Sequence, residues 1–259
     1  MLETQTINHL GKLRLQGMIK SLEEQKKVPD MSQMSFDERF AMVVDSEMLH
    51  RNNRQTVRRL KTANLKYPNA IPEDIDWNKK RDLDKKYILN MISCQWISEN
   101  QNIILCGKTG AGKTWLSCAF CHKACLEGYS VRFFRFPRLF GEINSAKADG
   151  TYEKFLLKLA KTNILVLDDW GQKLTSQMRL DLMEIIEDRC ETGSIIITSQ
   201  IPTKNWHEII GDPSIADSIM DRIIHKSHIF DLKGDSLRKN KAIGKFTKNN
   251  HKLLLRVPI

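Results

Sequence analysis

The sequence predicts an α/β fold in which helices cover both faces of a parallel sheet of five strands. From residue 102 onward, short apolar runs alternate with longer stretches of helical periodicity. Such runs are typical of strands buried on both faces, and their alternation with helices favours parallel pairing. Apolar residues make up 41% and charged residues 28% of the 259-residue chain, as in ordinary globular proteins. This length suits one large domain with a smaller appendage.

The elements of the predicted fold follow one another in a regular order. The predicted strands lie at 102–106, 130–136, 163–168, 194–200 and 228–232. The predicted helices lie at 113–127, 137–148, 152–161, 175–191, 203–210 and 214–226. One more helix, at about 81–98, is predicted before the first strand.

The first 66 residues are predicted to be mostly helical. Apolar side chains form an approximate amphipathic stripe at Ile7, Leu10, Leu13, Met18, Ile19 and Leu22. Ser35 and Glu38 form a capping box that opens a second helix. The apolar residues expected on one face of that helix are Phe36, Phe40, Val43 and Val44.

The prolines at positions 68 and 72 interrupt the helical pattern and mark a linker. We therefore divide the chain into a helical arm at 1–66, a linker at 67–80, an α/β domain at 81–245 and a basic tail at 246–259. The arm is the part expected to serve partners, assembly or DNA.

The charge of the chain limits its partners. Lysine and arginine outnumber aspartate and glutamate by 41 to 31, which gives a formal net charge of +10 and favours a polyanionic partner. No run approaches the roughly 18 uncharged apolar residues that a membrane helix needs, and the N-terminus lacks the apolar core of a signal peptide. We therefore expect a cytoplasmic protein with reduced cysteines and no membrane partner. The segment 118–122 matches the haem-attachment pattern C-x-x-C-H, but it lies in a predicted helix, where cysteines are expected to pack as small apolar side chains.

Basic residues gather at the end of the second N-terminal helix and around the second predicted strand. The candidates for contact with double-stranded DNA are Arg58, Arg59, Arg132, Arg135, Arg138 and Lys147. A solvated helix face is the alternative explanation for the basic helix, and both interpretations stay open. The neighbouring phenylalanines at 133, 134 and 136 are expected in the core. Because the sequence carries no helix-turn-helix or zinc-finger signature, DNA contact is expected to be largely independent of base sequence.

The segment 107–114 is a complete G-x-x-x-x-G-K-[ST] phosphate loop that follows a strand and precedes a helix. Its backbone N–H groups and the helix N-terminus are suited to binding phosphate. We expect Lys113 to reach the β- and γ-phosphates, and the Thr114 hydroxyl to bind Mg²⁺. The residues predicted to bind ATP are Gly107, Thr109, Gly110, Ala111, Gly112, Lys113, Thr114 and Trp115.

Two acidic residues end the third predicted strand, next to the expected phosphate site. Asp168 is predicted to be a ligand of Mg²⁺, directly or through water. Asp169 is placed where a carboxylate would orient the attacking water. The alternative is that both acids merely cap the strand. The fourth strand ends in Thr198-Ser199-Gln200, where a polar side chain would lie beside the γ-phosphate.

Phosphoryl transfer also needs a positive charge near the γ-phosphate. Arg222, at the end of a predicted helix, is a candidate for insertion into a neighbouring copy's site. Arg238, after the last strand, is a candidate for action within its own chain. Each is equally compatible with an ordinary surface arginine.

Taken together, the motifs resemble those of the IstB-like transposition helper ATPases, which group with DnaC-type helicase loaders in the AAA+ superfamily. The resemblance covers about residues 5–245 and includes LVLDDWG at 165–171, TSQ at 198–200 and a DP-x-x-A-D-x-x-x-D-R pattern at 212–222. It implies an AAA+ ATPase domain with strand order 5-1-4-3-2. By position, Gln200 would be sensor 1, Arg222 the arginine finger and Arg238 sensor 2.

The resemblance also implies a cycle of function. Family members assemble on DNA as homo-oligomers when ATP is bound, and they recruit and stimulate a cognate transposase. ATP and Mg²⁺ are the implied cofactors, and a bacterial cytoplasm is the implied location. Two departures from the wider superfamily stand out: the acidic pair is Asp-Asp where many members have Asp-Glu, and the 26 residues after Lys233 predict a reduced lid.

Three other functions fit part of the sequence. A DnaC-type helicase loader would share the same ATPase domain and differ in its partner. A phosphotransferase acting on a small metabolite would share the phosphate loop. A silent DNA-binding adaptor would hold ATP without cleaving it.

Overall fold

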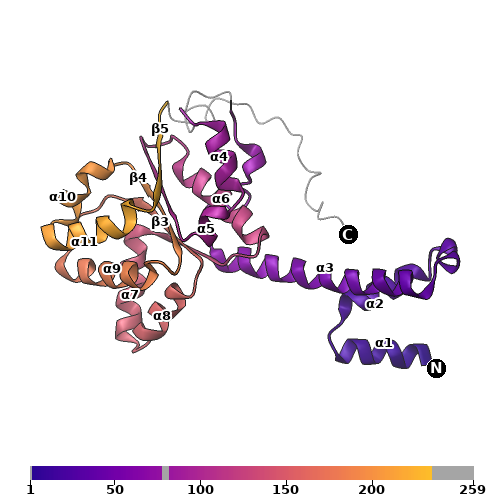
Figure 1. Cartoon of the computed structure of the whole chain (residues 1–259). Helices are drawn as coiled ribbons and strands as arrows, with labels where there is room; N and C mark the ends of the chain where they lie inside the picture. Colours follow the sequence, from indigo (N-terminus) through magenta and orange to yellow (C-terminus); the bar gives the residue numbers. More distant parts are fainter. Residues whose placement is uncertain (1, 78–81, 235–259) are drawn as a thin grey trace, which may run out of the picture.

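The computed structural model describes residues 2–77 and 82–234 and contains a parallel sheet of five strands (Figure 1). The strands are β1 (Asn102–Gly107), β2 (Val131–Arg135), β3 (Ile164–Trp170), β4 (Ser194–Ser199) and β5 (Ser227–Leu232). They are arranged in the order β2-β3-β4-β1-β5, and every pair is parallel. The predicted fold class, strand positions and strand order are thereby confirmed.

Side chains of the central strands alternate between two apolar cores, one on each face of the sheet. In β1, Ile103 and Leu105 enter one core and Ile104 enters the other. In β3, Val166 joins the first core and Leu167 the second. All five side chains are fully buried, which explains why the sequence of each strand is a continuous apolar run rather than an alternating one.

Helices cover both faces of this sheet. The first core is covered by α4 (Lys85–Ile92), α5 (Gln95–Ser98) and α6 (Lys113–Leu126). The second is covered by α7 (Phe136–Ala148), α8 (Tyr152–Ala160), α9 (Ser176–Arg189), α10 (Trp206–Ile210) and α11 (Pro213–Ile224). Short 3-10 turns at Pro29–Gln33, Pro72–Asp74 and Thr203–Asn205 complete the described elements.

The helix predicted at 81–98 is two helices, so that prediction was wrong. Asp84 caps the first through its side chain, which accepts from the backbone N–H of Lys86 at 2.8 Å. Cys94 then adopts a left-handed conformation with φ of 62° and separates α4 from α5. The break lets Trp96 turn into the core, where its indole N–H donates to the carbonyl of Met91 at 3.0 Å.

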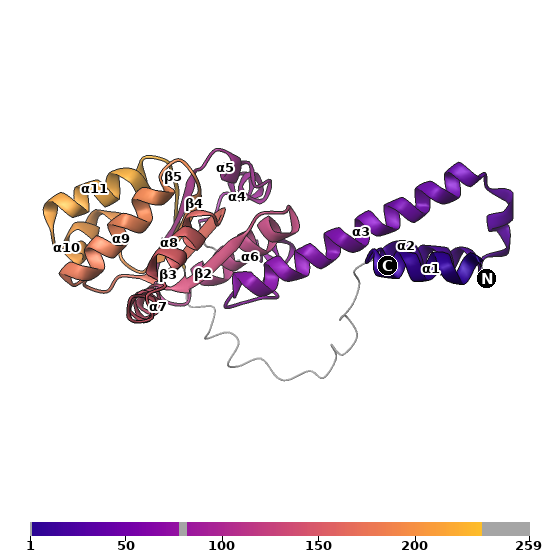
Figure 2. The same cartoon turned by 90° about the horizontal axis from the view of Figure 1, so that it is seen from below.

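The N-terminal region is a helical arm that projects from the α/β domain (Figure 2). It consists of α1 (Leu2–Lys12), α2 (Gln16–Gln25) and the long α3 (Phe36–Ala63). The predicted capping box is present, because Ser35 and Glu38 bond to each other's backbone N–H groups. The end of α3 is anchored on the first core through Ala63.

The apolar patterns of the arm are only partly buried. The predicted stripe is interrupted between α1 and α2, where Arg14 has a positive φ of 59° and Leu13 is exposed. On α3, Val43 is buried, whereas Phe36 and Phe40 stack on each other in solvent. The apolar residues predicted to share one face of this helix are therefore not buried together: some are buried and others are exposed.

A close crossing of α2 and α3 holds the arm together. The buried carboxylate of Glu47 accepts from the backbone N–H of Gly17 at 2.8 Å and is paired with Arg51. The Ser46 hydroxyl donates to the carbonyl of Gly17 at 2.9 Å. A Cβ at Gly17 would lie 2.5 Å from the Ser46 carbonyl oxygen, so a larger residue would force the helices apart.

Replacing Gly17 with alanine is expected to weaken the docking of α2 on α3 by about 1–3 kcal/mol, the usual effect of overpacking. Amide hydrogen exchange over residues 16–25 should speed up accordingly. The matched control is Gly11→Ala in α1, where a Cβ would meet nothing within 4 Å. That control should leave exchange in α2 unchanged; equal exchange in both variants would disprove the tight crossing.

The cysteines behave as packing residues. Cys118, Cys121 and Cys125 are fully buried in α6, as predicted for the haem-like segment. Burial raises the pKa of the Cys125 thiol to about 12, so the thiol stays protonated at neutral pH. Among the described residues, no group of His, Cys, Asp or Glu is arranged to hold a metal ion by itself. Nor does any helix in these residues have the length and apolar character needed to cross a membrane.

Candidate nucleotide site

The phosphate loop lies at the carboxyl end of β1, where its backbone is unusually confined. Gly107 has a φ of +141°, and a Cβ there would lie 2.4 Å from the carbonyl oxygen of Leu232 on β5. Gly112 has a φ of +99° and directly precedes α6. Both positions therefore require glycine. The resulting turn directs the N-terminus of α6 and its positive potential toward the loop, which suits an anion.

The side chain of Lys113 is folded into this loop. Its ammonium group donates to the carbonyl of Gly107 at 2.6 Å and to that of Lys108 at 3.0 Å. Lys113 is buried, as is Ala111, whereas Trp115 is half-buried and packs on the first core. The ammonium group is thus held within reach of any anion that the loop binds.

Asp168 is a buried carboxylate at the end of β3, and it faces the phosphate loop. Its Oδ1 accepts from the Thr114 hydroxyl at 2.6 Å and from the Thr198 hydroxyl at 2.7 Å. Its Oδ2 is buried without a hydrogen-bond donor in the described part of the chain, although the ammonium of Lys66 lies 3.5 Å away. A carboxylate oxygen and a hydroxyl are the hard ligands that Mg²⁺ prefers, so these residues fit that ion.

Asp169 lies in an irregular part of β3, and its side chain is bonded to a residue at the end of β2 and to a residue just after β4. The strand register with β4 shifts between Leu167 and Trp170, and Asp169 has a positive φ of 69°. Arg135 at the end of β2 donates to its Oδ2 at 2.9 Å, and the Gln200 side-chain amide donates to its Oδ1 at 3.3 Å. The loop residue Thr109 donates in turn to Gln200 at 2.6 Å. A continuous chain of polar contacts therefore links the phosphate loop to Asp169.

The Arg135 guanidinium, followed by the Gln200 amide, lowers the pKa of the Asp169 carboxyl, against the opposing effect of partial burial. Because this pKa is lowered on folding, the interaction stabilises the fold at pH values above the ordinary aspartate pKa. That stabilisation is lost as the pH falls through the lowered pKa.

Replacing Arg135 with glutamine is expected to raise the pKa of Asp169 toward its ordinary value. A carboxyl-carbon NMR titration of Asp169 measures the change directly. Arg132→Gln is the control, because Arg132 donates to the Thr62 carbonyl at 3.3 Å and contacts no carboxylate in the described contacts. If both variants titrated like wild type, the Arg135 contact would have no electrostatic role.

Arg222 lies at the other end of the sheet from the phosphate loop. The carbonyl of Ile223, the next residue, accepts from the side chain of Asn102 at the start of β1. Since β1 is about 17 Å long at roughly 3.3 Å per residue, Arg222 is far from the loop of its own chain. Its guanidinium binds Glu187 on α9 at 3.1 Å and the Ser218 carbonyl at 3.0 Å.

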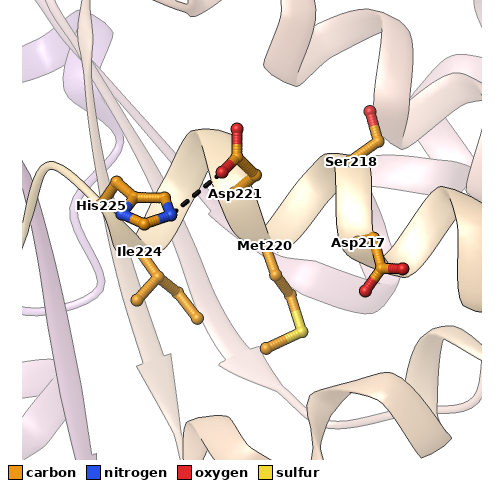
Figure 3. A pocket seen from close by; sticks show the side chains of 6 residues that line it. All are labelled: Asp217, Ser218, Met220, Asp221, Ile224 and His225. Atoms are coloured by element: carbon orange, nitrogen blue, oxygen red, sulfur yellow. Dashed lines mark ion pairs between the residues drawn. The ribbon is translucent and has the colours of Figure 1, made fainter.

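An open hollow of about 550 Å³ lies on the surface of α11 (Figure 3). Its walls are Asp217, Ser218, Met220, Asp221, Ile224 and His225, with an ion pair of 3.0 Å between His225 and Asp221. Ser218, which lines this hollow, also accepts a hydrogen bond from Arg222. The hollow is away from the phosphate loop.

In the structure, the candidate arginines for DNA contact lie on or near β2, whereas Lys147 is paired within the chain. Arg58 and Arg59 on α3 come near β2, because α3 packs against that strand and Arg132 bonds to Thr62 at its end. Arg138 is exposed on α7, beside the Arg135 position. Lys147 is instead engaged within the chain: its ammonium pairs with the buried Asp181 at 2.5 Å and lies over the Tyr152 ring.

Arg238 lies outside the described residues, as does the basic tail, so its role as sensor 2 stays a prediction. Two contacts of Asp168 were not predicted: the hydrogen bond from Thr198, which the sequence placed only in the polar strand end, and the ion pair with Lys66. No local pattern marks Lys66, because its contact with Asp168 joins segments that are far apart in the sequence.

Comparison with known proteins decides the family. The family model described as IstB-like ATP binding protein matches residues 8–244. The chain belongs to the IstB-like ATP-binding family. An insertion-sequence ATP-binding protein of Sinorhizobium fredii is 42% identical over 241 residues, which cover 93% of this chain and 98% of the relative. The ATP-binding protein of insertion sequence IS1162 from Pseudomonas fluorescens is 42% identical over 204 residues, which cover 78% of this chain and 88% of the relative.

Solved structures agree on the fold of this IstB-like chain. DnaI superposes with a TM-score of 0.54 and 21% identity, covering 65% of this chain and 90% of DnaI. The DnaC helicase loader superposes with a TM-score of 0.51 and 22% identity, covering 68% of this chain and 99% of the loader. At this level of identity the likeness establishes the AAA+ fold, as the sequence predicted, and nothing of the partner.

Proposed function

We propose that this IstB-like protein is an ATP-hydrolysing, DNA-binding helper of an insertion-sequence transposase. ATP drives assembly of several copies on duplex DNA, the assembly recruits and stimulates the transposase, and hydrolysis releases it. The observation that carries this proposal is the chain of hydrogen bonds from Thr109 of the phosphate loop through Gln200 to Asp169. The neighbouring Asp168 accepts a hydrogen bond from the Thr114 hydroxyl. Such an arrangement is suited to hydrolysis as well as to binding.

The reaction is in-line attack of water on the γ-phosphate. Lys113 exchanges its bonds to the loop carbonyls for bonds to phosphate oxygens, so its charge stabilises the transferring group. Thr114 and Asp168 would hold Mg²⁺, which neutralises phosphate charge when bound. Because its pKa is lowered, Asp169 is a weak base at neutral pH. Its role is therefore to orient the attacking water through a hydrogen bond.

The remaining positive charge comes from a second copy of the chain. Arg222 is too far from its own loop to reach the γ-phosphate, and it is held by Glu187 and Ser218 at one side of the domain. In an assembly of head-to-tail copies, this side would meet the loop of the next copy. The hollow on α11 would then lie at the interface between copies.

The proposed DNA surface runs along the base of the arm and the β2 edge of the sheet. Its residues are Arg58, Arg59, Arg132, Arg135 and Arg138. Lys147 is left out, because its ammonium group pairs with buried Asp181. Arg135 is kept, because its side chain is 54% exposed although it pairs with the partly exposed Asp169. Contact through phosphates alone predicts weak dependence on base sequence and a steep loss of affinity with salt.

A mixing experiment tests the shared site. Arg222→Ala and Asp169→Asn should each lose DNA-stimulated ATP hydrolysis. A one-to-one mixture should recover about a quarter of wild-type activity, because some neighbours then pair an intact site with an intact arginine. Lys226→Ala, which removes a nearby exposed ion pair with Glu191, is the control and should stay active. A mixture as inactive as its components would contradict a site completed by a neighbouring copy.

Helicase loading is the second candidate. It is supported by the fold shared with the DnaC loader, at 22% identity. The 42% identity to insertion-sequence proteins over nearly the whole chain favours transposition.

A further inference from the structure

Lys66 lies where the arm joins the α/β domain, and its side chain enters the nucleotide site. Its backbone position is fixed on both sides, because Leu65 before it and Ala70 after it are buried in the first core. From this fixed position its ammonium group reaches to 3.5 Å from Asp168 Oδ2. It also lies 6.0 Å from the centre of the Tyr67 ring.

The two partners of this ion pair have very different surroundings. The side chain of Asp168 is 1% exposed, whereas that of Lys66 is 42% exposed. The carboxylate therefore needs a cation close to Oδ2, since no described group donates a hydrogen bond to that atom. The lysine can leave, because water is available to its ammonium group.

The Oδ1 atom of the same carboxylate binds the Thr114 hydroxyl at 2.6 Å, and this is the pair that fits Mg²⁺. Two cations beside one buried carboxylate would repel each other strongly. The Lys66 ammonium and a metal ion at this site are therefore alternatives.

We propose that Lys66 is a built-in counter-ion that occupies the cation position of Asp168 until Mg²⁺ with nucleotide displaces it. The inference rests on the proposed magnesium site. Displacement breaks the ion pair and moves the ammonium group into solvent at the base of the arm.

The test is ADP binding measured calorimetrically over a range of Mg²⁺ concentrations, with EDTA as the metal-free reference. Lys66→Met should lower about fivefold the Mg²⁺ concentration that gives half of the metal-dependent gain in ADP affinity, which is the scale of a partly exposed ion pair. The ADP affinity measured without metal should be unchanged. Lys66→Arg, which keeps the charge, should behave like wild type. Lys61→Met, an exposed lysine on α3, is the matched control and should also match wild type.

Thermal unfolding in metal-free buffer gives a second readout. Lys66→Met should unfold at a lower temperature than Lys66→Arg, and Mg²⁺ with ADP should remove the difference. An unchanged or weaker Mg²⁺ dependence in Lys66→Met would overturn the counter-ion role alone. If wild type bound ADP without regard to Mg²⁺, the proposed metal site would fail, and the role of Lys66 with it.

Discussion

Replacing Lys113 with alanine is expected to weaken ATP binding at least about 100-fold, which corresponds to about 2.7 kcal/mol. The variant loses the ammonium group that donates to the Gly107 and Lys108 carbonyls inside the phosphate loop. The glycine turns and the N-terminus of α6 remain, so residual binding is expected to be weak rather than absent. Calorimetric titration with ATP and Mg²⁺ measures the loss.

Lys108→Ala is the matched control for this prediction. Lys108 is in the same loop, but its side chain is exposed. Its removal should change ATP affinity by less than about threefold, the scale of an exposed charge. Thermal unfolding of both variants separates loss of binding from loss of structure. Wild-type affinity in a folded Lys113→Ala variant would mean that ATP binds elsewhere.

Replacing Arg189 with methionine is expected to lower the free energy of unfolding by about 3–5 kcal/mol. This arginine is fully buried in α9 and faces no carboxylate among its described contacts. Its guanidinium instead donates to backbone carbonyls of Leu159, Thr162, Asn163 and Ser194. These carbonyls lie at the end of α8 and the starts of β3 and β4, so one side chain ties three elements together.

Methionine fills a similar volume but removes the guanidinium donor from four carbonyl groups, which is costly in a buried place. The carbonyls of Leu159 and Asn163 keep a backbone N–H donor, so the cost at these two is smaller. Burial lowers the pKa of Arg189 to about 10, so the wild-type side chain is still charged at neutral pH. We expect the midpoint of thermal unfolding to fall by about 10 °C. Arg54→Met on the exposed surface of α3 is the control, with an expected change within about 0.5 kcal/mol. Equal midpoints for the two variants would disprove the role of Arg189.

Much of the α/β domain could be predicted from sequence, because its strands are buried on both faces. Ile103 and Ile104 illustrate this: each enters a different core, so neither of these adjacent positions tolerates a polar residue. The phosphate loop could be predicted for a similar reason, since the positive φ of Gly107 and Gly112 restricts those positions to glycine.

The arm and the details of the site could be predicted only in part. The break at Cys94 depends on the burial of Trp96, which is a tertiary contact without a local signal. The contacts of Asp169 with Arg135 and of Asp168 with Lys66 join distant segments. Sequence alone therefore identified Arg135 by its charge, as a DNA candidate, and not by its contact with the carboxylate.

The proposed ATP-dependent assembly on DNA is tested most directly by the mass of the protein on duplex DNA. Size-exclusion chromatography with light scattering should be run with ATP, with ADP and without nucleotide. The account predicts a large DNA-bound oligomer with ATP alone, lost in Lys113→Ala and Arg222→Ala, and weakened by salt. A monomer whose mass is the same under all three conditions would contradict it.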